Sequence, residues 1–152
     1  MKHIALFLAL CTLWSCQQQM DTSVVVSGVV TEAVNETASV IYHDRSKTII
    51  DSLDANSTFE IAFNIEVPTY VDFKHGREST AMYVKPGDRI QLSINPSEFD
   101  ESISYQGSDA SNYLAKKYLL EEQVDFRELY SSEETEFLKI VDDTESKMYQ
   151  LL

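Results

Sequence analysis

The chain has 152 residues, of which 12 are basic and 25 acidic, so its formal net charge is −13 at pH 7 and it is expected to repel nucleic acid. Hydrophobic residues make up 43% of the composition, which is typical of a folded globular domain rather than a disordered chain. Cysteine occurs only as Cys11 and Cys16, so the sequence after residue 16 offers no thiol for a disulfide, a redox centre or a Cys-based metal site.

The N-terminus predicts a lipoprotein signal peptide. After a short basic start, the apolar run from Ile4 to Leu13 is about half as long as the roughly 20 residues that a membrane-spanning helix needs. It ends in Leu13-Trp14-Ser15-Cys16, which resembles a bacterial lipobox, so Cys16 is the predicted lipidation site. We expect residues 1–15 to be removed and residues 16–23 to form a polar tether that holds the protein on an envelope membrane, facing the periplasm. The alternative is an ordinary cleaved signal peptide that leaves no lipid on Cys16.

Residues 24–107 predict an antiparallel β-sandwich of about eight strands. Apolar and polar residues alternate, most clearly from Phe59 to Ile65 and from Ile90 to Ile94. No helical pattern interrupts the strands, so a parallel sheet lacks its usual crossover connections. Each strand has one apolar face, which predicts two sheets packed face to face, with a closed barrel as the competing arrangement. The expected strands cover residues 24–34, 39–42, 48–53, 59–65, 67–73, 80–84, 90–94 and 102–106.

The strongest turn signal of the chain is Lys85-Pro86-Gly87-Asp88. Pro86 presets φ at the second position of a turn, and Gly87 accepts a positive φ at the third. We therefore assign Pro86, Gly87 and Asp88 a structural role in a turn between two strands.

Residues 108–152 predict a connector made of two helices. Ser108-Asp109 can cap the first helix, whose apolar residues recur at helical spacing as far as Tyr130. The sequence Ser131-x-x-Glu134 resembles a capping box and predicts the start of the second helix. The second apolar stripe reaches Leu151-Leu152 without a stop signal, which predicts that a further domain follows; the alternative is a frayed terminus.

Polar clusters elsewhere favour structural interpretations. His43-Asp44-Arg45 is predicted to be a polar turn rather than an acid–base trio, since adjacent side chains on a strand point to opposite faces. His75, beside Gly76, is predicted to lie at the tip of a hairpin. Glu98, Asp100 and Glu101 carry oxygens that suit calcium, but their spacing does not match an EF-hand loop. We therefore expect no catalytic residue, no metal and no cofactor in this chain. A sugar-binding platform among the 8 Tyr and 7 Phe residues is an alternative use of the aromatic side chains.

Three motifs follow one another in a distinctive order. They are Met82-Tyr83-Val84-Lys85-Pro86-Gly87-Asp88, the run from Pro96 to Gly107, and Asn112-Tyr113-Leu114. Together they resemble the N-terminal region of envelope thiol-disulfide oxidoreductases of the TlpA/ResA kind, over roughly Val24 to Leu152. That family has a β-rich N-terminal domain, a helical connector and a C-terminal thioredoxin-like domain, whose Cys-x-x-Cys carries out the redox chemistry.

The resemblance implies that Asn112 and Tyr113 start the connector helix. Because no cysteine follows Cys16, no catalytic residue of the family can be carried over to this chain. The resemblance leads to a first hypothesis, a lipid-anchored accessory or interaction domain of a thioredoxin-like oxidoreductase that itself lacks the redox Cys pair. Its partners would be the membrane, through the N-terminal lipid, and a thioredoxin-like domain or redox partner protein, with no nucleic acid.

Two other hypotheses remain open. One is a free-standing envelope lipoprotein that binds a glycan or a peptide on the sandwich. The other is an enzyme with chemistry that uses no thiol.

Overall fold

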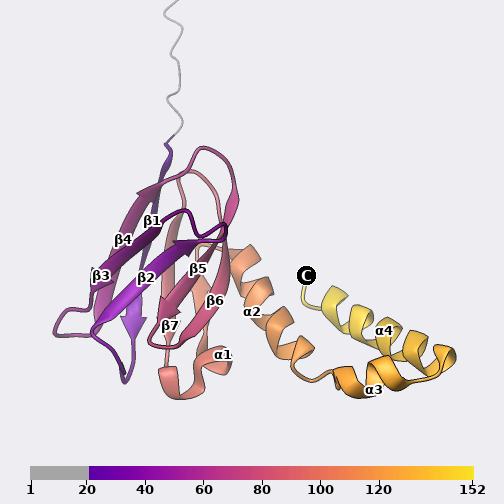
Figure 1. Ribbon diagram of the computed structural model, residues 1–152. Helices are drawn as coiled ribbons and strands as arrows, with labels where there is room; N and C mark the ends of the chain where they lie inside the picture. The colour runs from indigo at the N-terminus through magenta and orange to yellow at the C-terminus, as the bar shows by residue number, and fades with distance from the viewer. Residues whose placement is uncertain (1–20) are drawn as a thin grey trace, which may run out of the picture.

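The computed structural model describes residues 21–152, and Figure 1 shows a β-rich body followed by helices. The expected signal peptide, residues 1–15, and the expected lipidation site, Cys16, lie outside the described residues, as does most of the tether. Strand β1 (Ser23–Val30) begins one residue earlier than expected, so the last residue of the predicted tether already belongs to the sandwich.

Within residues 21–152, eight strands form two four-stranded sheets, with the orders β4-β1-β7-β8 and β3-β2-β5-β6. The sheets pack face to face in a sandwich, which confirms the predicted fold class, mainly β with helices at the C-terminal side (Figure 1). The other strands are β2 (Thr37–Tyr42), β3 (Thr48–Ser52), β4 (Thr58–Asn64), β5 (Thr69–His75), β6 (Glu78–Val84), β7 (Arg89–Ile94) and β8 (Ser104–Gln106).

One strand pairing differs from the expected antiparallel arrangement. β1 and β7 are hydrogen-bonded neighbours in parallel, with Val26 opposite Ile90 and Gly28 opposite Leu92. The expectation failed here because it required a crossover helix between parallel strands. In this fold β2 to β6 provide the connection between β1 and β7, so no helix is needed.

The core lies between the sheets and follows the predicted alternation. In β4 Phe59, Ile61 and Phe63 are buried while the intervening residues are exposed. Phe59 packs across the sandwich against Phe73 of β5, with 5.0 Å between the ring centroids. The inward-facing residues of β1 and β7 are also buried, so the period-two pattern of the sequence marks the core face.

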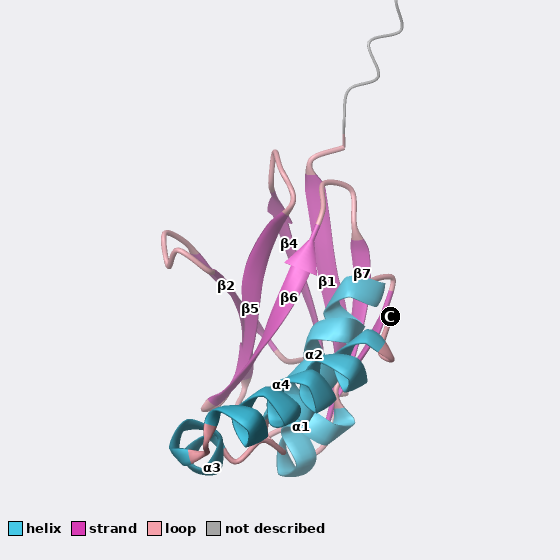
Figure 2. Cartoon of the chain, turned by 90° about the vertical axis from the view of Figure 1, so that its right-hand side faces the viewer, coloured by secondary structure: helices cyan, strands magenta, loops and turns pink. Residues whose placement is uncertain are grey.

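The helical part is more divided than the two predicted helices. A 3₁₀ turn (Pro96–Glu98) and the short α1 (Phe99–Ser102) lie between β7 and β8, and α2 (Asp109–Glu121), α3 (Phe126–Ser131) and α4 (Glu134–Tyr149) follow. In Figure 2, α4 folds back toward α2, which it contacts. We call residues 122–152, which contain α3 and α4, the helical arm. None of the helices described is both long and apolar enough to cross a membrane.

The predicted first helix breaks after Glu121, and a side-chain cap explains the restart. Asp125 Oδ1 accepts hydrogen bonds from the backbone N–H groups of Arg127 and Glu128, at 2.9 and 3.0 Å. The predicted capping box at Ser131 does not form, because Ser131 is the last residue of α3 and α4 starts without a side-chain cap. A local cap therefore separates α2 from α3 where the apolar stripe alone predicts continuity.

Candidate functional site

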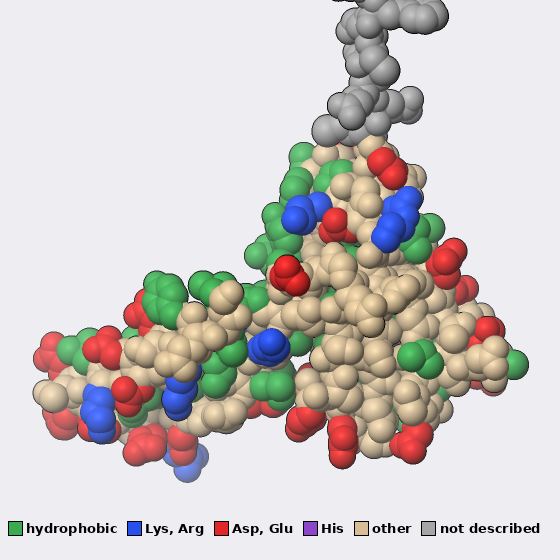
Figure 3. All heavy atoms as spheres, turned by 180° about the vertical axis from the view of Figure 1, so that it is seen from behind, with side chains coloured by type: hydrophobic (Ala, Val, Ile, Leu, Met, Phe, Trp, Pro, Cys, Tyr) green, Lys and Arg blue, Asp and Glu red, His purple; other side chains and the backbone are tan. Residues whose placement is uncertain are grey.

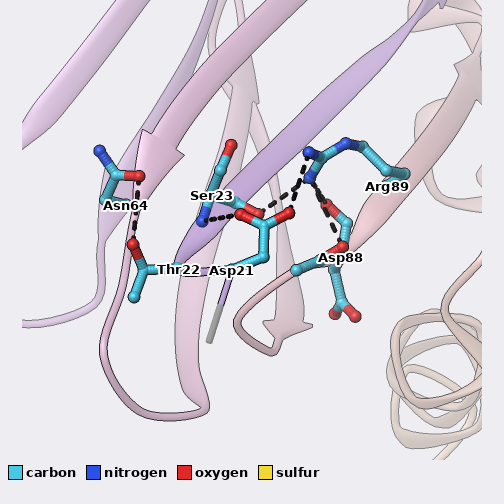
Figure 4. A network of polar contacts seen from close by, with 7 residues as sticks. Asp21, Thr22, Ser23, Asn64, Asp88 and Arg89 are labelled. Carbon is cyan, nitrogen blue, oxygen red and sulfur yellow. Dashed lines mark hydrogen bonds and ion pairs between the residues drawn. The ribbon is translucent and has the colours of Figure 1, made fainter. Parts of the chain in front are cut away.

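The predicted turn at residues 85–88 and the following Arg89 hold the chain where it enters β1 (Figure 4). The Arg89 side chain donates from Nη1 to the carbonyl oxygens of Ser23 and Asp88, at 2.9 and 3.1 Å. Its Nη2 lies 3.4 Å from Asp21 Oδ2, and the other oxygen of that carboxylate accepts from the Ser23 N–H. Arg89 therefore ties the entering chain to the start of β7.

The backbone of the turn adopts the conformation that its sequence predicts. Gly87 has a φ of +89°, and its N–H donates to the carbonyl of Ser23 at 3.1 Å. The Asp88 carboxylate accepts from the Lys85 N–H at 2.7 Å and closes the turn, while the half-buried Pro86 occupies the second position. The predicted turn residues thus form the junction between the sandwich and the segment that precedes it.

A second junction holds α2 against the sandwich. The Asn112 side chain pairs with the backbone of β8, since its Oδ1 accepts from the Tyr105 N–H at 2.9 Å and its Nδ2 donates to the Tyr105 carbonyl at 2.7 Å. The amide thereby makes the two hydrogen bonds that a neighbouring strand would make with Tyr105 at the edge of β8. The helix starts at Asp109, three residues before Asn112, with Ser108 as its cap as expected; Tyr113 is half-buried on the same helix.

The edge of β6 is satisfied by the same helix. Ser108 and Ser111 are buried, and both hydroxyls lie 3.3 Å from the Tyr83 carbonyl oxygen. The Ser111 hydroxyl also accepts from the Tyr83 N–H at 3.1 Å. Side chains of α2 and of its cap therefore bond to one edge strand of each sheet, which fixes the direction of the helix relative to the sandwich.

An acidic cleft of about 330 Å³ lies between α1, α2 and strands β5 and β6. Asp72, Asp100 and Glu121 contribute carboxylates to its wall, and Lys117 pairs with Glu121. Partial burial, reinforced by nearby acids led by Glu122, raises the pKa of Asp100 from its ordinary value. The cleft favours positive charge.

The three acids considered for calcium are not grouped together in the structure. Asp100 lies in the cleft wall, whereas Glu98 and Glu101 are exposed. Among the described residues, no three His, Cys, Asp or Glu side chains are placed to share a metal ion. No local sequence pattern marks the cleft, because its acids come from a strand and two helices that only the tertiary fold brings together.

The two histidine positions differ in their surroundings. His43 is exposed in a turn, 3.9 Å from Asp72. His75 is the last residue of β5, next to the predicted hairpin turn, but unlike a tip residue it is buried: it is 1% exposed, and its Nδ1 lies 3.0 Å from the Thr37 carbonyl oxygen. Its Nε2 accepts from the Val34 N–H at 3.2 Å, so the neutral ring carries its proton on Nδ1. His75 thus pins the loop between β1 and β2 to the core.

The outer face of the β4-β1-β7-β8 sheet carries few charges. Among its outward-facing residues only Glu60 and Arg89 are charged. Two shallow hollows on it, of about 260 and 440 Å³, share the polar residues Ser27, Gln91 and Gln106. Figure 3 shows this side of the sandwich with a broad area of uncharged side chains and backbone. We call it the uncharged face.

The chain was compared with protein-family models, with curated proteins and with solved structures, and none of them matches it. Its function is therefore inferred from its own motifs and from the geometry of the two junctions, the cleft, the uncharged face and the helical arm.

Proposed function

We propose that the chain is the lipid-anchored N-terminal accessory and interaction domain of a thioredoxin-like thiol-disulfide oxidoreductase, itself without the redox Cys pair. It sits in the bacterial envelope on the periplasmic side of a membrane. Its physical task is to hold and orient the redox unit, or to contact the substrate of that unit. The order of the motifs at residues 82–88, 96–107 and 112–114 supports this assignment.

The observation that carries the proposal is the fixed attachment of α2. Asn112 and Ser111 bond to backbone groups of two different strands, one in each sheet. A helix held at two sheet edges transmits a defined direction to whatever follows it, whereas a flexible linker would not. In Figures 1 and 2, α2 runs away from the end of the sandwich where the N-terminal strand enters, and α4 then folds back beside it. The fixed position of α2 suits a rigid spacer between the membrane anchor and the redox unit.

Lipid attachment is tested by metabolic labelling with a radioactive fatty acid. We expect label on the wild-type chain and on Cys11→Ala, which keeps Cys16, and none on Cys16→Ala. The Cys16→Ala variant should also leave the membrane fraction. Label that persists in Cys16→Ala would contradict the predicted anchor.

The redox context is tested by sequencing the gene past the codon for Leu152. We expect a reading frame that encodes Cys-x-x-Cys within a β-α-β pattern. The chain of residues 1–152 should not accelerate insulin reduction by dithiothreitol, because it has no Cys pair after residue 16. A stop codon without any thioredoxin-like frame, or insulin reduction by this chain, would contradict the proposal.

A second candidate is a lipoprotein that binds a glycan or peptide, and the uncharged face favours it. Hydroxyl and amide side chains around Ser27, Gln91 and Gln106 can donate and accept hydrogen bonds to a neutral ligand. A thermal-shift screen with neutral glycans and peptides tests this, since a ligand that binds only the folded state raises the melting temperature. Gln91→Ala should abolish any such shift, while Gln123→Ala, outside the face, should not.

A further inference from the structure

The helical arm exposes more large apolar side chains than the sandwich does. Of the eleven exposed large hydrophobic residues in the described part of the chain, seven lie at or after Tyr118, and α4 contains no buried residue. A single exposed apolar residue is ordinary, but a group of them framed by charges indicates a binding surface. The seven residues are Tyr118, Phe126, Tyr130, Leu138, Val141, Tyr149 and Leu152.

Some of these residues form a groove between α3 and α4. Phe126 and Leu129 form one wall, and Ile140, Val141 and Met148 form the other. The groove has a volume of about 220 Å³. Pockets for small molecules usually measure roughly 300–1,000 Å³, so this groove suits an inserted apolar side chain better than a free ligand.

An acidic hollow of about 230 Å³ adjoins the groove. The two share a wall that includes Ile140 and Thr144, and the hollow adds the carboxylates of Asp125, Glu128 and Asp143. One base, Lys147, also lines it. An apolar recess and an acidic recess therefore lie side by side, within reach of one partner segment.

From this arrangement we propose that the helical arm binds a basic amphipathic segment of a partner protein. Apolar side chains of the segment enter the groove, and its Lys or Arg side chains face Asp143 and Glu128. Helices that place an apolar stripe in a groove are a common mode of peptide recognition. The proposal deepens the accessory role proposed above, on which it rests, by naming the chemistry of the partner.

The negative charge of the helical arm disfavours two other binding partners, a second copy of this chain and anionic lipid. Residues 122–152 contain 9 acids against 3 bases, so a second copy of this chain would bring like charge to the surface. Anionic lipid is disfavoured for the same reason. A basic segment instead gains favourable electrostatics at the contact, which increases the association rate and the specificity.

The test uses the full chain in neutral detergent and a fluorescent model peptide made of Leu and Lys with helical amphipathic spacing. We expect saturable binding whose Kd rises with salt, because exposed charges are screened. A peptide of the same design with Glu in place of Lys should bind at least about tenfold more weakly. Equal binding of both peptides, or no saturation, would overturn the proposal.

Matched variants locate the site. Phe126→Ser and Val141→Ser together should weaken binding about tenfold or more, as loss of central apolar contacts does at other interfaces. Leu138→Ser removes a side chain of α4 that is also about half exposed but lies outside the groove, and should leave Kd within about twofold. All of these side chains are more than a third exposed, so the substitutions should not unfold the chain. An equal loss in the Leu138 control would contradict the assigned groove.

The charged half of the site has its own pair of variants. Asp143→Asn should weaken the Leu and Lys peptide and reduce its salt dependence, whereas Asp142→Asn, one residue earlier and outside the hollow, should do neither. Hydrogen exchange on the arm with anionic vesicles in place of peptide tests the lipid alternative, and protection by vesicles alone would overturn the proposal. If the peptide fails to bind while the downstream gene encodes Cys-x-x-Cys, the partner chemistry is wrong and the accessory role stands.

Discussion

Replacing Asn112 by alanine removes the side chain that joins α2 to β8. The substitution breaks hydrogen bonds of 2.9 and 2.7 Å to the two backbone groups of Tyr105, whose side chain is buried. A typical protein hydrogen bond contributes about 1 kcal/mol net, so the loss is about 2 kcal/mol. Alanine is the better helix former by up to about 0.7 kcal/mol, which offsets part of it. We expect the free energy of unfolding to fall by about 1–2 kcal/mol.

The assay is urea unfolding followed by far-ultraviolet circular dichroism, since the single tryptophan, Trp14, lies outside the described residues. Lys116→Ala, an exposed substitution on the same helix, is the matched control and should change stability by less than about 0.5 kcal/mol. Hydrogen exchange at the Tyr105 amide gives a local readout, and it should accelerate in Asn112→Ala only. Equal stability of the two variants, with unchanged exchange at Tyr105, would refute the role assigned to Asn112.

Three further predictions concern the sandwich and the cleft. Gly28→Ala should destabilise the chain by about 1–3 kcal/mol in urea unfolding, because a Cβ there would lie 1.9 Å from the backbone oxygen of Leu92. His75→Ala should lower the free energy of unfolding by about 2–4 kcal/mol, since it leaves a cavity and two backbone groups without their partner. Asp100→Asn should raise the melting temperature at pH 7, because the raised pKa of Asp100 means that its ionisation disfavours the folded state.

The stability gain expected from Asp100→Asn depends on pH. A carboxyl whose pKa is raised on folding reduces stability once it is ionised, so the gain from Asp100→Asn should shrink as the pH falls through the folded pKa of Asp100. A gain that is the same at pH 3 and pH 7 would contradict the electrostatic explanation. Ser27→Ala is the control for Gly28→Ala, and Lys74→Ala is the control for His75→Ala. A loss of stability in a control as large as in its paired variant would contradict the assigned contacts.

Local sequence signals predicted much of the architecture. The alternation from Phe59 to Ile65 marks a strand with one buried face, and Gly87 marks a turn that needs a positive φ. The cap at Ser108 predicts the start of α2. The break between α2 and α3 also has a local signal, because Asp125 stands three residues before Glu128 in a capping pattern that the longer apolar stripe obscured.

Local patterns in the amino-acid sequence predict which strand residues face the core, where the main helical part begins, and where most of the turns lie. These properties depend on neighbours within a few residues, so a local pattern expresses them. Three features could be known from the folded structure alone: β1 pairs with β7 in parallel, His75 reaches Thr37 and Val34, and carboxylates from β5, α1 and α2 share one cleft. Such contacts join segments far apart in the chain, and their choice depends on the packing free energy of the whole sandwich rather than on any local preference.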